Sequence, residues 1–192
     1  MTSAATALSS TELDVASLVI RLALGPMLVL HGVNKVQGGL SGTAGWFESL
    51  GLRPGWLHAR FAAFTEIGAG LLVTLGLLNG LAAMAFVGLM TVAALTDHRG
   101  KGYFIFKGGW EYVVLVAIVA VALAVLGPGR WSLDNALGLD LAGLGWGALA
   151  AVGGVAAAGA MLAAFYRPSA PEGSGDGAGD GSGSGSGSRA SA

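Results

Sequence analysis

Five long runs of apolar residues, separated by short segments rich in glycine and charge, most constrain what this chain can fold into. The runs cover residues 15–33, 61–78, 81–95, 110–126 and 144–165. About 20 helical residues cross the hydrocarbon core of a bilayer, and lipid tolerates no unpaired backbone polar groups there. A mean hydropathy of +0.70 and only 11% charged residues fall outside the range of soluble domains. We therefore predict an all-α integral membrane bundle with five transmembrane helices.

These runs divide the chain into four regions. Residues 1–14 are a polar N-terminal segment in which Ser9 and Glu12 have the spacing of a helix capping box. A four-helix membrane domain follows over residues 15–137, and an additional transmembrane helix lies within 138–166. The Gly/Ser-rich residues 167–192 are too polar to bury a core, so we predict a disordered tail.

Two connections carry structural information. Only Asn79-Gly80 separates the second run from the third, which predicts an antiparallel hairpin of closely packed helices. The third run is short for a membrane span, so its helix is expected to extend to Thr96 or beyond. Residues 34–60 hold three aromatic side chains among glycines, which predicts a helix lying at the membrane interface.

The distribution of Lys and Arg predicts an orientation. The first loop is residues 34–60 and the third loop is residues 96–109. Of the ten basic residues, only Arg21 and Arg130 lie on the side opposite these two loops and the tail. The positive-inside rule then predicts a multi-pass protein of the inner or plasma membrane, with the N-terminus outside and the tail cytoplasmic.

Ionisable residues inside the runs are the candidate functional residues, since each costs about 2.5 to 3.5 kcal/mol on insertion scales. They are Arg21, His31, Lys35, Glu66 and Glu111. Alternating helix directions place the last four at one membrane level near the cytoplasmic end. Arg21 is expected near the outer end, facing Asp134 or a backbone carbonyl.

Three interpretations of this cluster stay open: an ion network that locks the helices together, a proton or quinone-headgroup site, or a transport path. His31 could exchange protons near neutral pH. The chain has no cysteine and therefore no thiol chemistry, and no basic run interleaved with aromatics points to nucleic acid. The three histidines have no zinc-site spacing, a haem between His31 and His98 is not expected, and His58 is expected to be solvated at the interface.

Two glycine-rich segments flank the fourth run, at residues 107–112 and 127–134. Neither has the spacing of a phosphate-binding loop, so we expect turns at the membrane interface with aromatic anchors. The residues of this interface motif are Gly108, Gly109, Trp110, Gly127, Gly129 and Asp134. In the fifth run, small residues at four-residue spacing would let the helix pack closely on the bundle or on a second copy.

Four segments together resemble the DoxX family: His31-Gly-Val-Asn-Lys35, Glu66-Ile-Gly-Ala-Gly, Gly-Gly-Trp-Glu111-Tyr and Gly-Pro-Gly-Arg-Trp-Ser-Leu-Asp134. The resemblance covers roughly residues 15–137 and implies a four-helix membrane core. It also implies a link to quinone-reducing thiosulfate oxidation and to membrane complexes that handle oxidative or thiol stress. The fifth run and the Gly/Ser tail depart from the family pattern.

We therefore predict a component of a membrane redox complex that is not itself thiol-active. Quinone is the cofactor that this interpretation allows. The expected partners are the lipid bilayer, redox proteins or a second copy of the chain. The alternatives are a small-solute or proton carrier and a membrane scaffold with a purely structural ion network.

Overall fold

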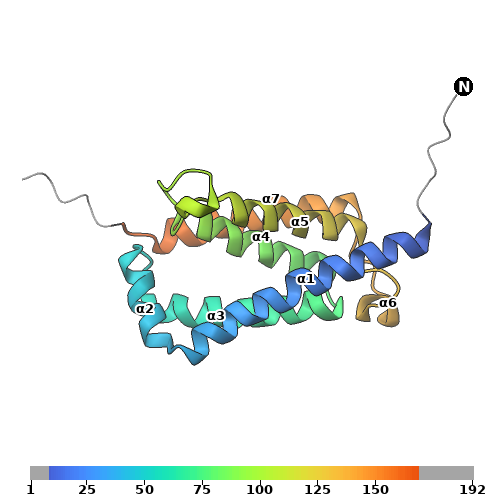
Figure 1. The fold of residues 1–192 in the computed structure, drawn as a ribbon, viewed down its shortest axis with the longest axis horizontal. Helices are drawn as coiled ribbons and strands as arrows, with labels where there is room; N and C mark the ends of the chain where they lie inside the picture. The colour runs from blue at the N-terminus through green and yellow to red at the C-terminus, as the bar shows by residue number, and fades with distance from the viewer. Residues whose placement is uncertain (1–8, 169–192) are drawn as a thin grey trace, which may run out of the picture.

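The computed structural model describes residues 9–168 (Figure 1), and that part of the chain is mostly helical. It contains seven α-helices and the short 3₁₀ helix η1, Ile105–Lys107. The α-helices are α1 Ser10–Gln37, α2 Leu40–Ser49, α3 Gly55–Leu75, α4 Asn79–Leu95, α5 Glu111–Leu126, α6 Leu133–Leu137 and α7 Leu144–Phe165. The predicted all-α class is confirmed, and the predicted tail, residues 167–192, lies outside the described residues from residue 169 on.

The five predicted spans correspond to α1, α3, α4, α5 and α7. Helices α1 and α7 are long and apolar enough to cross a membrane, and α4 and α5 are shorter apolar helices. Large apolar side chains cover the outside of the bundle: Leu30 is 67% exposed, Phe61 68% and Val152 70%. A surface of this kind is solvated by lipid rather than by water, so the fold is a helical membrane bundle.

The helices form two groups, which Figure 1 shows as a pair, α1 with α3, lying against α4, α5 and α7. The backbones of α1 and α3 touch at glycines. A Cβ atom on Gly25 would lie 2.7 Å from the carbonyl oxygen of Gly70, and one on Gly32 would lie 2.7 Å from that of Ala63. No larger residue fits these positions without separating the two helices.

The start of α1 follows the predicted capping box. The amide of Glu12 donates to the Ser9 hydroxyl at 3.3 Å, and the amide of Ser9 donates to the Glu12 carboxylate at 2.6 Å. Two otherwise unpaired N–H groups are thereby satisfied, which fixes the helix start outside the apolar run.

The expected hairpin needs correction. The turn between α3 and α4 is residues 76–78, and Asn79 and Gly80 form the first turn of α4 instead of the connection. Helix α3 contacts α4, but it packs mainly on α1, whereas α4 packs mainly on α7 and α5. Helix α4 ends at Leu95, so the expected extension to Thr96 or beyond is wrong. The helix is longer at its start instead, where Asn79 and Gly80 precede the predicted run.

Helix α7 closes the bundle through its small residues. Gly147, Ala150, Gly154 and Ala158 are its buried positions. A Cβ atom on Gly154 would lie 2.7 Å from the Cβ atom of Val87, so α4 and α7 approach to backbone distance. The small-residue stripe therefore packs within the chain.

The first loop, the third loop and the end of α7 meet at one end of the molecule, as predicted. Leu52 and Tyr166 form an antiparallel bridge, flanked by a hydrogen bond of 3.0 Å from the Arg53 amide to the Phe165 carbonyl. The Arg99 guanidinium lies 3.5 Å from the Tyr166 hydroxyl. The expected interfacial helix is α2, which lies at this end too (Figure 1).

Candidate functional site

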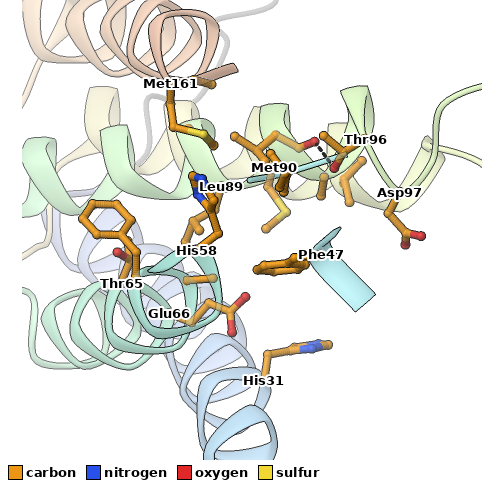
Figure 2. Close-up of a pocket in the computed structure, with 18 of the residues that line it drawn as sticks. His31, Phe47, His58, Thr65, Glu66, Leu89, Met90, Thr96, Asp97 and Met161 are labelled. Atoms are coloured by element: carbon orange, nitrogen blue, oxygen red, sulfur yellow. Dashed lines mark hydrogen bonds between the residues drawn. The ribbon is translucent and has the colours of Figure 1, made fainter. Parts of the chain in front are cut away.

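A cavity of about 620 Å³ lies between the α1–α3 pair and helices α4 and α7, at the end that α2 covers. Its volume is within the usual range of pockets for small ligands. Most of its wall is apolar, and Figure 2 shows Phe47, Leu89, Met90 and Met161 from three different helices converging on it.

The polar part of the cavity wall consists mainly of titratable side chains. All three histidines of the chain, His31, His58 and His98, line the cavity, together with Lys35 and Glu66. Such a concentration of titratable groups in one apolar cavity marks it as the candidate functional site.

Lys35 and Glu66 form the ion pair that joins α1 to α3. The Lys35 Nζ atom lies 2.7 Å from both carboxylate oxygens of Glu66, and the two side chains are 17% and 12% exposed. Lys35 is in the last turn of α1, where the helix dipole favours a cation. The close backbone approach at Gly32 brings this end of α1 onto α3, so these two members of the expected cluster do lie together.

His31 lies one helical turn before Lys35 and is exposed. Figure 2 shows its imidazole on the same side of the cavity as the Glu66 carboxylate. The two residues are therefore neighbours, with the His31 ring at the rim.

His58 was expected to be solvated, and this expectation is wrong. The side chain is only 7% exposed, and its ring meets the ring of Phe165 edge-on at 5.2 Å. Its Nε2 atom is buried and has no hydrogen-bond partner within residues 9–168. Helix α3 begins at Gly55, six residues before the apolar run, and therefore carries His58 into the cavity wall.

His98 and Asp97 line the cavity at the end of α4. The Nδ1 atom of His98 lies 2.6 Å from the Gly108 carbonyl oxygen, and its Nε2 atom lies 3.8 Å from the Asp97 carboxylate. Asp97 also receives a hydrogen bond of 3.1 Å from Lys101. The third loop is thus connected to the cavity wall through these polar contacts.

Glu111 does not join the cluster. Its carboxylate accepts a hydrogen bond of 3.1 Å from the amide of Ile105, within the loop before α5, and it is outside the cavity wall. The expected contact with Lys35 and Glu66 is not formed, because Glu111 stabilises the turn of its own chain segment.

Arg21 lies at the opposite end of the molecule, as expected, and donates to backbone carbonyls. Its guanidinium binds the carbonyl oxygens of Val73 at 3.1 Å, Thr74 at 2.9 Å, Pro128 at 2.6 Å and Trp131 at 3.0 Å. These hydrogen bonds satisfy the donors of the guanidinium and join α1 to the end of α3 and to the segment before α6. Arg21 therefore has a structural role.

Asp134 stabilises the same end. It is fully buried, and its carboxylate accepts the amides of Leu78 at 2.7 Å and Asn79 at 2.9 Å. These amides open α4, so Asp134 supplies a cap from a distant part of the chain. Gly127 and Gly129, both with positive φ, form the turn that leads to it.

The other part of the interface motif folds the third loop. Gly108 has a φ of +78°, and a Cβ atom on Gly109 would lie 2.5 Å from the carbonyl carbon of Tyr103. The Trp110 ring meets the Tyr103 ring edge-on at 4.9 Å. Both glycine-rich segments are therefore tight turns that place aromatic side chains at the ends of the bundle.

Comparison with known proteins identifies the family. A family model described as DoxX matches residues 16–99, a range that holds the three histidines and the Lys35–Glu66 pair. No solved structure matches.

Two proteins are similar to this chain over most of their own lengths. "Putative oxidoreductase CatD" of Bacillus subtilis is 30% identical over 110 residues, which are 57% of this chain and 79% of that protein. "Uncharacterized membrane protein Rv3486" of Mycobacterium tuberculosis is 30% identical over 128 residues, which are 62% of this chain and 78% of that protein. With its helical membrane fold, this chain belongs to the DoxX family.

Proposed function

We propose that this protein is a component of a membrane redox complex and holds a lipid-soluble quinone in the cavity between the α1–α3 pair and α4 and α7. The observation that carries the proposal is an apolar cavity of about 620 Å³ with the Lys35–Glu66 pair and three histidines in its wall. The name of the Bacillus subtilis relative, a putative oxidoreductase, supports the same class of function.

A quinone needs two different environments, and the cavity provides both. Its isoprenoid tail requires apolar walls, which Phe47, Leu89 and Met161 provide. Its ring carbonyls require hydrogen-bond donors. The Lys35 ammonium has three N–H donors, of which two bind Glu66, so one remains for a ligand.

Reduction of a quinone to a quinol takes up two electrons and two protons. The chain has no cysteine, so the electrons come from a partner oxidoreductase rather than from a thiol of this protein. His31 lies at the rim of the cavity beside Glu66, where its imidazole can pass protons to a bound ring.

The proposal includes an orientation in the plasma membrane. Lys35, Arg53, Arg99 and Lys101 lie at the cavity end of the molecule, and the positive-inside rule places this end in the cytoplasm. Redox partners would therefore approach the loops around the cavity mouth, and the N-terminus would face outward.

Electron transfer to quinone in the complex purified from native membranes tests this function. Glu66→Gln and Lys35→Met should each lower the rate of quinone reduction at normal protein abundance. Glu111→Gln is the matched control, because its carboxylate is outside the cavity wall, and should leave the rate unchanged. Unaltered rates in both cavity variants would remove the proposal.

One observation favours a second candidate, a small-solute or proton carrier. Thr96, Asp97 and His98 extend the polar wall of the cavity toward the third loop, where water is close. Flux of protons or small solutes into liposomes that contain the purified protein alone would support the carrier. Cluster variants that lower thermal stability and alter neither flux nor electron transfer would instead indicate a scaffold.

A further inference from the structure

His58 is the feature of the cavity that the ion pair does not explain. Its side chain is 7% exposed, its Nε2 atom is buried, and that atom has no hydrogen-bond partner among residues 9–168. A buried polar atom without a partner is unfavourable, and native proteins keep few of them. Because His58 lines a ligand-sized cavity, a ligand bound there can supply the missing partner.

The position of His58 on α3 relates it to the rest of the polar wall. Thr65 and Glu66 follow it by seven and eight residues, which is close to two full turns, so the three side chains lie on one face of the helix. At 1.5 Å per residue, His58 and Glu66 are about 12 Å apart along the helix axis. Both side chains line the cavity, and Figure 2 shows both of them in its wall.

We infer that His58 is a ligand-binding residue, whose Nε2 atom hydrogen-bonds one edge of a planar head group while the Lys35–Glu66 pair binds the opposite edge. The inference rests on the proposed function, and it adds the residue that binds the second edge of the ring. The ligand must then be a lipid-soluble molecule with hydrogen-bonding oxygens on opposite edges of a ring. A 1,4-quinone has this arrangement.

Histidine also suits both redox forms of such a head. A neutral imidazole places its proton on either ring nitrogen, so Nε2 can donate to a carbonyl or accept from a hydroxyl. His58 can therefore bind the oxidised ring and the reduced ring without a change in charge. Its aromatic contact with Phe165 holds the ring in place at the end of α7.

Quenching of tryptophan fluorescence by decylubiquinone measures this binding in the full-length protein in lipid nanodiscs. Trp46 lines the cavity. The variant Trp46→Phe should therefore lose most of the quenching. The wild-type protein should show saturable quenching from which a dissociation constant is obtained.

Two substitutions at His58 separate the hydrogen bond from the shape of the side chain. His58→Phe keeps an aromatic ring and removes Nε2, so decylubiquinone should bind about tenfold more weakly, the effect of one lost hydrogen bond. It should also raise the melting temperature of the ligand-free protein, because the unpaired nitrogen is gone. His58→Gln keeps a hydrogen-bonding group near the same place and should bind within about threefold of the wild-type protein.

Each outcome decides between the two proposals. Saturable quenching that is equally strong in His58→Phe would overturn the role of His58 and leave the proposed function standing. Equal losses of affinity and of melting temperature in both variants would show a structural role and also overturn it. No saturable quenching in the wild-type protein would overturn the quinone site and His58 together.

Discussion

Replacement of Asp134 by alanine should strongly destabilise the bundle. The fully buried carboxylate accepts two amides, those of Leu78 at 2.7 Å and Asn79 at 2.9 Å, at the start of α4. Hydrogen bonds to a charged group contribute about 1.5 to 3 kcal/mol each, and the variant leaves both amides buried without an acceptor. We expect Asp134→Ala to lower the free energy of unfolding by about 4 kcal/mol, and Asp134→Asn, which keeps one acceptor, by about 2 kcal/mol.

Unfolding by SDS in mixed micelles, followed by circular dichroism at a helical wavelength, measures this difference. Asp140→Asn is the matched control, because Asp140 is exposed in the segment after α6 and its replacement should change the free energy by at most about 0.5 kcal/mol. A loss of less than about 1 kcal/mol in Asp134→Ala would refute the conclusion that this carboxylate caps α4.

Three further predictions concern the packing of the helices. Lys35→Met should lower the free energy of unfolding by about 2 kcal/mol because it leaves the Glu66 carboxylate unpaired, and Glu66→Leu in the same chain should restore part of that loss in a double-mutant cycle. Gly154→Val should cost about 1 to 3 kcal/mol in SDS unfolding, since the new side chain meets α4 at backbone distance. Cysteines introduced at positions 52 and 166 should form a disulfide under mild oxidation, visible as a shift on non-reducing gels, because this bridge is a non-hydrogen-bonded pair whose side chains are close.

The controls use features of the same chain. At Gly159 of α7, a Cβ atom meets nothing within 4 Å, so Gly159→Val should be tolerated where Gly154→Val is not. The chain has no natural cysteine, so each single-cysteine variant should show no such intramolecular shift. Equal effects at both glycines, or no cross-link in the double variant, would contradict the placement of α7.

The helices could be predicted from the sequence because their signal is local. Each apolar run is long, and turn residues bound it, so the five helices of the predicted spans were recognised with boundaries several residues off. The interfacial helix α2 was expected from the aromatic residues between the first two runs. Which helices pack together is a non-local property. The two-residue connection Asn79-Gly80 suggested that α3 and α4 are the main partners, but the glycines at positions 25, 32 and 70 bring α1 onto α3 instead.

The candidate site was predicted in part. Lys35 and Glu66 were paired correctly, because two opposite charges at one membrane level must find each other. Glu111 was misplaced, since depth alone does not show that its carboxylate turns back to its own loop. His58 was missed because it lies among polar and aromatic residues before the apolar run. Pro54, which directly precedes α3, marks the true start of that helix and could have brought His58 into the span.

The turn of residues 76–78 lies at the end of the molecule opposite the cavity. Helices α1 and α3 interlock through backbone contacts and form one packed unit against α4, α5 and α7. Their covalent link to α4 is this turn, where Leu78 has a φ of +52°, which few non-glycine residues adopt, and where Asp134 grips two successive amides. Because the cavity lies at the far end, between these two groups of helices, its width depends on the angle at which this turn joins them.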